Sequence, residues 1–198
     1  MYKKRLGSKA LAAACGLGLA ASLLGAASPV IAEEAKGTSG STEVQVKADT
    51  SNMTFRVPTV ISFAANADGT LTTPSDSATN IENRSVFGIH VTGMKVKAGD
   101  SWNIVTDKQA AASASTDNNI AFSVGPDGAP QNAADAMTDE GLDLSANSAF
   151  NMTYQNGTND TLELKSTGSV AKVDGRQLTG EGAKVATITW TLAPGSAS

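Results

Sequence analysis

Hydrophobic and polar residues alternate along much of this chain, and the clearest alternation lies near its C-terminus. Between residues 183 and 192, Ile188, Trp190 and Leu192 share one face, while threonines occupy the other. A period of two places successive side chains on opposite sides of an extended backbone. Threonine is β-branched and favours that backbone over a helix. The pattern therefore predicts a β-strand with one hydrophobic face.

Similar short alternations recur through the rest of the chain. They predict strands at residues 42–48, 53–57, 60–63, 85–92, 94–97, 101–105, 120–124, 149–154, 161–165, 170–173 and 176–178. Turn residues separate them, with Gly93 between two strands and hairpins predicted at 149–165 and 170–178. About ten short strands without a long helix predict an all-β fold, an antiparallel β-sandwich of the Ig-like or Greek-key type with long loops.

Two long loops interrupt the strands. Residues 109–119 contain a run of small residues that can form a helical turn, but they lack a hydrophobic stripe to fix it. Residues 125–140 contain two prolines and a second candidate helical turn at 133–137. Because long loops often carry function, we expect the binding surface in the loops, above all in 125–140.

The N-terminal residues have the composition of a secretory signal peptide helix. Four basic residues precede an uncharged apolar run at 10–27, and the small residues at 30–32 predict cleavage after Ala32. The alternative is an uncleaved membrane anchor, since 18 apolar residues almost span a bilayer. The predicted organisation is a signal peptide at 1–32, a flexible linker at 33–41, a β-sandwich domain at 42–194 and a disordered tail at 195–198.

Export changes the charge and the cysteine content of the chain. Four of the 15 basic residues and none of the 19 acidic residues lie before residue 33, so the remainder has a net charge of −8. Such a surface repels nucleic acid and anionic membranes, and we exclude both as partners. Cys15, the single cysteine, leaves with the signal, so the exported chain has no disulfide and its core must stabilise it.

The residue inventory restricts catalysis. His90 is the one histidine, and the alternation of its strand places it on the outer face, away from Phe87 and Ile89. A cysteine nucleophile and a multi-histidine zinc site are therefore excluded, and a serine triad has no supporting motif. Paired carboxylates of a glycosidase type stay open, with Asp139, Glu140 and Glu163 as candidates. We predict a protein that is not an enzyme.

Calcium is the one metal that the loops leave open. The candidate carboxylates belong to Asp49, Asp68, Asp76, Asp107 and Asp117. Their spacing does not fit an EF-hand loop, and solvated turn carboxylates are the favoured interpretation. We therefore predict neither a metal site nor a cofactor.

The two tryptophans are each followed two residues later by an aliphatic residue, as Trp102 by Ile104 and Trp190 by Leu192. Burying one tryptophan removes about 150–250 Å² from water, so a place in the core is the favoured interpretation for both. Stacking on carbohydrate would instead require exposed rings, and the exported chain offers few aromatic side chains.

These motifs resemble the two Trp-x-Leu motifs of WxL-domain proteins of Gram-positive bacteria, the second of which lies near the C-terminus. Trp190-Thr191-Leu192 matches the second motif, and Trp102-Asn103-Ile104 corresponds to the first with isoleucine in place of leucine. The strand at 57–63 is similar to the first strand of that family. The resemblance covers about residues 53–194 and fits a divergent member.

The resemblance implies a secreted protein held non-covalently on the cell wall through peptidoglycan. No Leu-Pro-x-Thr-Gly sorting signal occurs in the sequence, which agrees with non-covalent retention. The alternative function is a structural subunit of a surface fibre or protein complex, assembled by β-strand pairing through edge strands or residues 33–48. A secreted hydrolase with an acid pair in a cleft is the third hypothesis.

Overall fold

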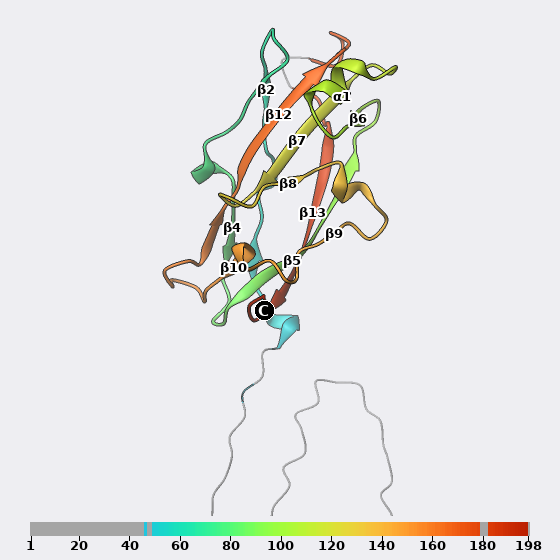
Figure 1. The fold of residues 1–198 in the computed structure, drawn as a ribbon. Coiled ribbons are helices and arrows are strands. Elements are labelled where there is room, and N and C mark those ends of the chain that lie inside the picture. The colour runs from blue at the N-terminus through green and yellow to red at the C-terminus, as the bar shows by residue number, and fades with distance from the viewer. Residues whose placement is uncertain (1–45, 47–48, 179–181, 198) are drawn as a thin grey trace, which may run out of the picture. The chain divides into compact units, whose positions relative to one another are not determined.

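Short strands and the loops between them make up most of the computed structural model of this chain (Figure 1). The structure describes residues 46, 49–178 and 182–197, all within the unit Val46–Ser198. The predicted signal peptide, the linker and nearly all of the predicted strand 42–48 lie outside the described residues. None of the helices in the described part is long and apolar enough to cross a membrane.

Strands and short helices follow one another along the described chain. The strands are β1 (Phe55–Arg56), β2 (Ala64–Ala65), β3 (Leu71–Thr72), β4 (Asn80–Asn83), β5 (Ile89–Ala98), β6 (Asn103–Ile104), β7 (Asn119–Gly125), β8 (Gln131–Asn132), β9 (Leu142–Asp143), β10 (Asn151–Met152), β11 (Thr161–Glu163), β12 (Lys165–Ala171) and β13 (Ala186–Pro194). The helices are α1 (Lys108–Ser113) and the 3₁₀ turns η1 (Thr50–Asn52), η2 (Asp76–Ala78), η3 (Asp135–Met137) and η4 (Ser148–Phe150).

The strands form four sheets. One four-stranded sheet has the order β10-β5-β13 with β9 also on β5, and another has the order β12-β7-β6 with β8 also on β7. A third sheet has the order β1-β4-β11, and β2 with β3 forms a hairpin. Within these described ladders β6 and β7 run parallel and the other pairs antiparallel. The predicted all-β class is confirmed.

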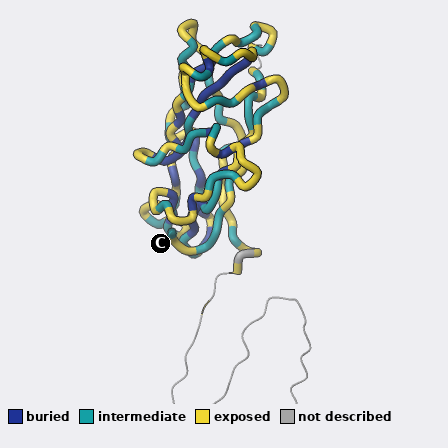
Figure 2. Tube along the Cα trace, turned by 45° about the vertical axis from the view of Figure 1, so that its right-hand side comes forward, coloured by how far each residue is buried: buried dark blue, intermediate teal, exposed yellow. Residues whose placement is uncertain are grey.

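One hydrophobic cluster joins residues of the different sheets. The interior side chains of β5 are almost completely buried, with Ile89 and Val91 at 0% exposed and Val96 at 2%. Ile120 and Val124 of β7 belong to the same cluster. In Figure 2 the buried segments of the chain run lengthwise through the interior, and exposed loops lie around them. Alternating apolar positions on several strands thus meet in one core, as the period of two requires.

The predicted turn at Gly93 is wrong, because β5 continues through it. Gly93 pairs with Asp143 of β9 on one side and with Thr191 of β13 on the other. A Cβ atom at this position would lie 3.3 Å from the Leu142 carbonyl oxygen. The glycine therefore permits close approach of neighbouring backbones, and glycine inside a strand often has this role.

Both predicted hairpins after residue 149 are also wrong. β10 pairs with β5 and β11 pairs with β4, so the two halves of 149–165 join different sheets. In the second case, residues 175–177 form a turn after β12, so the predicted strand 176–178 is absent. The Asp174 carboxylate accepts hydrogen bonds from the backbone N–H and the guanidinium of Arg176, which stabilises a turn over a strand.

Three further segments can be compared with the structure that the sequence predicts for them. Residues 60–63 alternate but join no described ladder. The small-residue loop contains α1, whose first turn is capped by the Asp107 carboxylate accepting from the Ala110 N–H at 2.8 Å. The 3₁₀ turn η3 lies inside the candidate helical turn at 133–137.

The strand pattern predicts that His90 lies on an exposed face. In the structure this residue is instead buried, at 8% exposed. Its ring Nδ1 lies 3.1 Å from the carbonyl oxygen of Gly195, so the C-terminal residues cover the outer side of β5 here. Ala197 adds a second contact by donating its N–H to the Asn151 side chain. A segment predicted as a disordered tail thus buries the one histidine.

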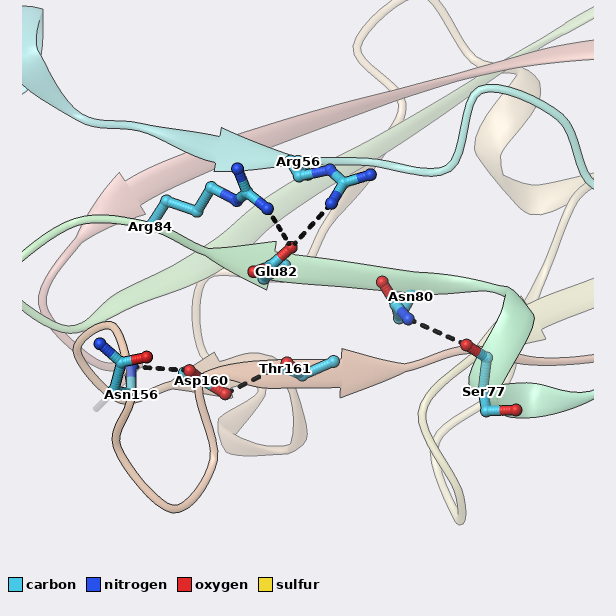
Figure 3. A network of polar contacts seen from close by, with 8 residues as sticks. All are labelled: Arg56, Ser77, Asn80, Glu82, Arg84, Asn156, Asp160 and Thr161. Atoms are coloured by element: carbon cyan, nitrogen blue, oxygen red, sulfur yellow. Dashed lines mark hydrogen bonds and ion pairs between the residues drawn. The ribbon is translucent and has the colours of Figure 1, made fainter.

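Polar side chains line the exposed face of the sheet β1-β4-β11 (Figure 3). Glu82 lies between two arginines, with its Oε2 3.4 Å from Arg56 and 3.2 Å from Arg84. Just before β11, Asp160 accepts a hydrogen bond from the backbone N–H of Asn156. These contacts are solvent-exposed, so they orient the loops and contribute little to stability.

Candidate functional site

The first tryptophan motif lies at the turn that follows β5. Gly99, Asp100 and Ser101 turn the chain, and the Trp102 N–H donates to the Gly99 carbonyl at 3.2 Å. The Trp102 side chain is 5% exposed, while Ile104 is partly buried against the core. The indole Nε1 has no hydrogen-bond partner among the described residues. This motif therefore packs inward.

The second motif lies in β13, which pairs with β5 along its length. Trp190 is opposite Met94 and Leu192 is opposite Val91. Both side chains are partly buried and pack against the core. The start of β13 also meets Trp102, which lines a hollow of about 410 Å³ with Lys184 and Thr187. The first motif thus lies beside the start of the strand that contains the second motif.

A polar cleft of about 500 Å³ lies in another part of the described chain. Its described lining residues are Asp76, Pro126, Asp127, Ser148, Ala149, Asn151, Asn159, Thr161, Leu162, Glu163 and Lys165. Carboxylate, amide, hydroxyl and ammonium groups dominate this set, and it contains no aromatic ring. Pro126 and Asp127 belong to the loop 125–140, in which the sequence predicts the binding surface.

Lys165 organises the charges of the cleft. Its Nζ lies 3.0 Å from the Asp127 carboxylate and 3.9 Å from that of Asp76. The hydrogen bond from Lys165, and then its charge, lower the pKa of Asp127. The hydrogen bond to Asp127 correspondingly raises the pKa of Lys165. Asp127 therefore stays ionised at neutral pH and is poorly suited to donate a proton as a general acid.

The structure separates the carboxylates that the sequence offers for catalysis. Glu163 lies in the cleft. Asp139 and Glu140 are exposed on the loop before β9, where the Asp139 backbone carbonyl accepts from Lys95. Sequence reasoning considered Asp76 only as a calcium candidate and missed Lys165, and it did not predict that these two residues meet, because they lie 89 positions apart. Spacing along the chain carries no signal for such a meeting.

The calcium candidates also lie in different places. Asp49, Asp68 and Asp107 each accept hydrogen bonds from residues just after them in the chain. Asp76 lies in the cleft, and Asp117 is an exposed loop residue. Within the described residues, no group of three or more His, Cys, Asp or Glu side chains is placed to hold a metal ion.

Comparison of the chain with family models, curated proteins and solved structures finds no match.

Proposed function

We propose that this chain is an exported, non-catalytic surface protein retained non-covalently on cell-wall peptidoglycan. The observation that carries the proposal is the polar cleft, where Lys165 pairs with Asp127 and Asp76 and where Glu163 also lines the wall. Peptidoglycan presents sugar hydroxyls, amides, carboxylates and amino groups. The carboxylates of the cleft match its hydroxyl and amino groups, and the ammonium of Lys165 matches its carboxylates. The signal-like N-terminus and the WxL resemblance of the sequence support the same location.

The second part of the proposal concerns architecture. We propose that the sheets around β5 and β7 are the two layers of a β-sandwich. Ile89 and Val96 of one sheet share a core cluster with Ile120 and Val124 of the other. In this arrangement the two tryptophan motifs close the core, and the loops at the sheet ends make the binding surface.

A sedimentation assay on purified, insoluble peptidoglycan tests this function. The matched variants are Glu163→Ala with Asn159→Ala in the cleft, and Glu140→Ala with Gln109→Ala outside it. All four side chains are exposed, and none is seen in a hydrogen bond or ion pair among the described residues. We expect the cleft variant to lose most of its retention and the outer variant to bind like the parent protein.

Salt dependence sharpens the assay. The net charge of −8 after residue 32 means that charge attraction to an anionic wall does not drive binding. Added salt screens repulsion, so we expect retention to persist or rise from low to high ionic strength. Absence of retention at every salt concentration would refute the function. Equal retention of both double variants would instead refute the cleft as its site.

A further inference from the structure

β13 is the edge strand of its sheet, and half of its backbone groups face away from β5. The sheet order β10-β5-β13 leaves no described strand on the outer side of β13. The Gly99 N–H donates to the Val185 carbonyl at 2.9 Å, which fixes the hydrogen-bonding phase of the ladder. Bonded pairs alternate in an antiparallel ladder, so Ala186, Ile188 and Trp190 direct their N–H and C=O groups outward.

Over Ala186–Thr191 this edge has no charge, no proline and no bulge, because the register shift after Thr191 and Pro194 both lie beyond that range. Exposed edges tend to be short, charged or covered. β13 runs from Ala186 to Pro194, and its sequence contains no charged residue over that range. Its core-facing side chains, among them Ile188 and Trp190, are only partly buried. An added strand would both pair the backbone and cover these side chains.

We propose that β13 pairs antiparallel with β13 of a second copy of this chain, around a twofold axis at Ile188. In this register Ala186 lies opposite Trp190 of the other copy, and Ile188 lies opposite its equivalent. These pairs lie on the core side and are hydrogen-bonded. Thr187 faces Thr189 on the outer side in a non-hydrogen-bonded pair. The two sheets become one continuous sheet.

Three observations favour a second copy as the occupant. Because β13 contains no charged residue, no like charges lie directly opposite each other across the new pair of strands. The chosen register places the small Ala186 against the large Trp190, so the side chains fit in both directions. The axis also lies within Ala186–Thr191, where the register against β5 is regular before it shifts. The proposal uses residues outside the polar cleft and does not depend on peptidoglycan binding.

Disulfide trapping tests the register directly. Thr187→Cys and Thr189→Cys are made separately in a Cys15→Ser background, which removes the one native cysteine. Cα atoms of a non-hydrogen-bonded pair are about 4.5 Å apart, within disulfide range. Equivalent positions of the two copies lie about 7–8 Å apart diagonally, which is too far. Mild oxidation should therefore cross-link the mixture of the two variants but neither variant alone.

The size of the effect and its control are defined in advance. We expect the mixture to give about tenfold more covalent dimer than either single variant, because thiol geometry decides the yield. The control mixture contains Thr167→Cys, at an exposed threonine of β12, in place of one of the two β13 variants. It should give only background amounts of covalent dimer. Equal yields from all mixtures, or strong cross-linking of one variant alone, would overturn the register. If residues 42–48 rather than a second copy paired with the β13 edge, the mixture would also give only background cross-linking, which would overturn the proposal.

A charge variant tests the dimer without threatening the fold. Within one copy, Thr187 lies opposite Lys97 and Thr189 opposite Lys95, so glutamate at both positions gains cross-strand partners. Between copies the introduced glutamates face each other. Thr187→Glu with Thr189→Glu should raise the dimer dissociation constant about tenfold in sedimentation equilibrium at an unchanged melting temperature. Unchanged self-association, or a strictly monomeric parent protein at high concentration, would refute the dimer.

Discussion

The two long edge strands of this protein, β12 and β13, differ in what lies along their outer sides. The outer side of β12 is met by the β2–β3 hairpin, where the Val170 N–H donates to the Gly69 carbonyl at 2.8 Å. β12 also begins with Lys165, a charged residue. β13 has no second paired strand among the described residues and no charge along its length. Among the described residues, one edge is therefore met by another segment of the chain and the other is paired on one side only.

The side chains of β12 are also more deeply buried than those of β13. Ser166 and Ser169 of β12 are each 7% exposed, and Leu164 immediately before the strand is 1% exposed. The core-facing residues of β13, including Leu192, stay only partly buried. Since burial sets the cost of truncating a side chain, the two edges should respond differently to the same substitution.

The largest expected effect comes from truncating leucine at the two edges. Leu164→Ala should lower the free energy of unfolding by about 4 kcal/mol, because a fully buried side chain leaves a cavity. Leu192→Ala should cost about 2 kcal/mol, since solvent already reaches part of its side chain. Urea denaturation of the two variants measures the difference. Equal losses would show that β13 is covered in solution and would break the comparison.

A smaller effect should follow from adding one methyl group to the covered edge. A Cβ atom at Gly168 would lie 2.8 Å from both the Ala121 carbonyl oxygen and Leu71 Cδ1. Gly168→Ala should therefore cost about 2 kcal/mol by pushing the hairpin away from β12. Gly175→Ala is the matched control, because nothing lies within 4 Å of its added Cβ atom. A neutral Gly168→Ala in thermal melts would mean that the hairpin does not close this edge.

The sequence allowed the prediction of the β-class and of β13 because both depend on local alternation. Ile188, Trp190 and Leu192 have the period of two that any half-buried strand requires. Pairing partners were harder, since the hairpin at 149–165 is the local solution that turn residues favour. The structure instead places β10 on β5 and β11 on β4. Long-range packing decides such choices, and a single sequence contains no direct record of it.

The cleft shows the same limit for side chains. The sequence indicated the loop 125–140, and Pro126 and Asp127 of that loop line the cleft. Its partners Asp76 and Lys165 were not predictable, because β12 and η2 meet only through the tertiary fold. His90 failed for a related reason. The alternation of its strand predicts an outward-facing, exposed side chain, but the residues after β13 contact the ring and bury it.

The smallest expected effect concerns the charges at the start of β12. Lys165 lowers the pKa of Asp127 by hydrogen bonding and by its charge, so the folded state binds that proton less tightly than the unfolded chain. The resulting stabilisation is complete above the unfolded pKa of about 3.9 and is lost as the pH falls through the lower folded value. Lys165→Met should therefore flatten the acid side of the melting-temperature profile.

Solvent screening keeps this effect small, because both side chains of the pair are exposed. High salt should flatten the profile of the parent protein and leave that of Lys165→Met nearly unchanged. Thr167→Met, on an exposed position of the same strand, controls for the methionine itself. If Lys165→Met instead began to self-associate, the charge would be protecting the β12 edge as well. The contrast with β13 would then rest on charge in addition to the covering hairpin.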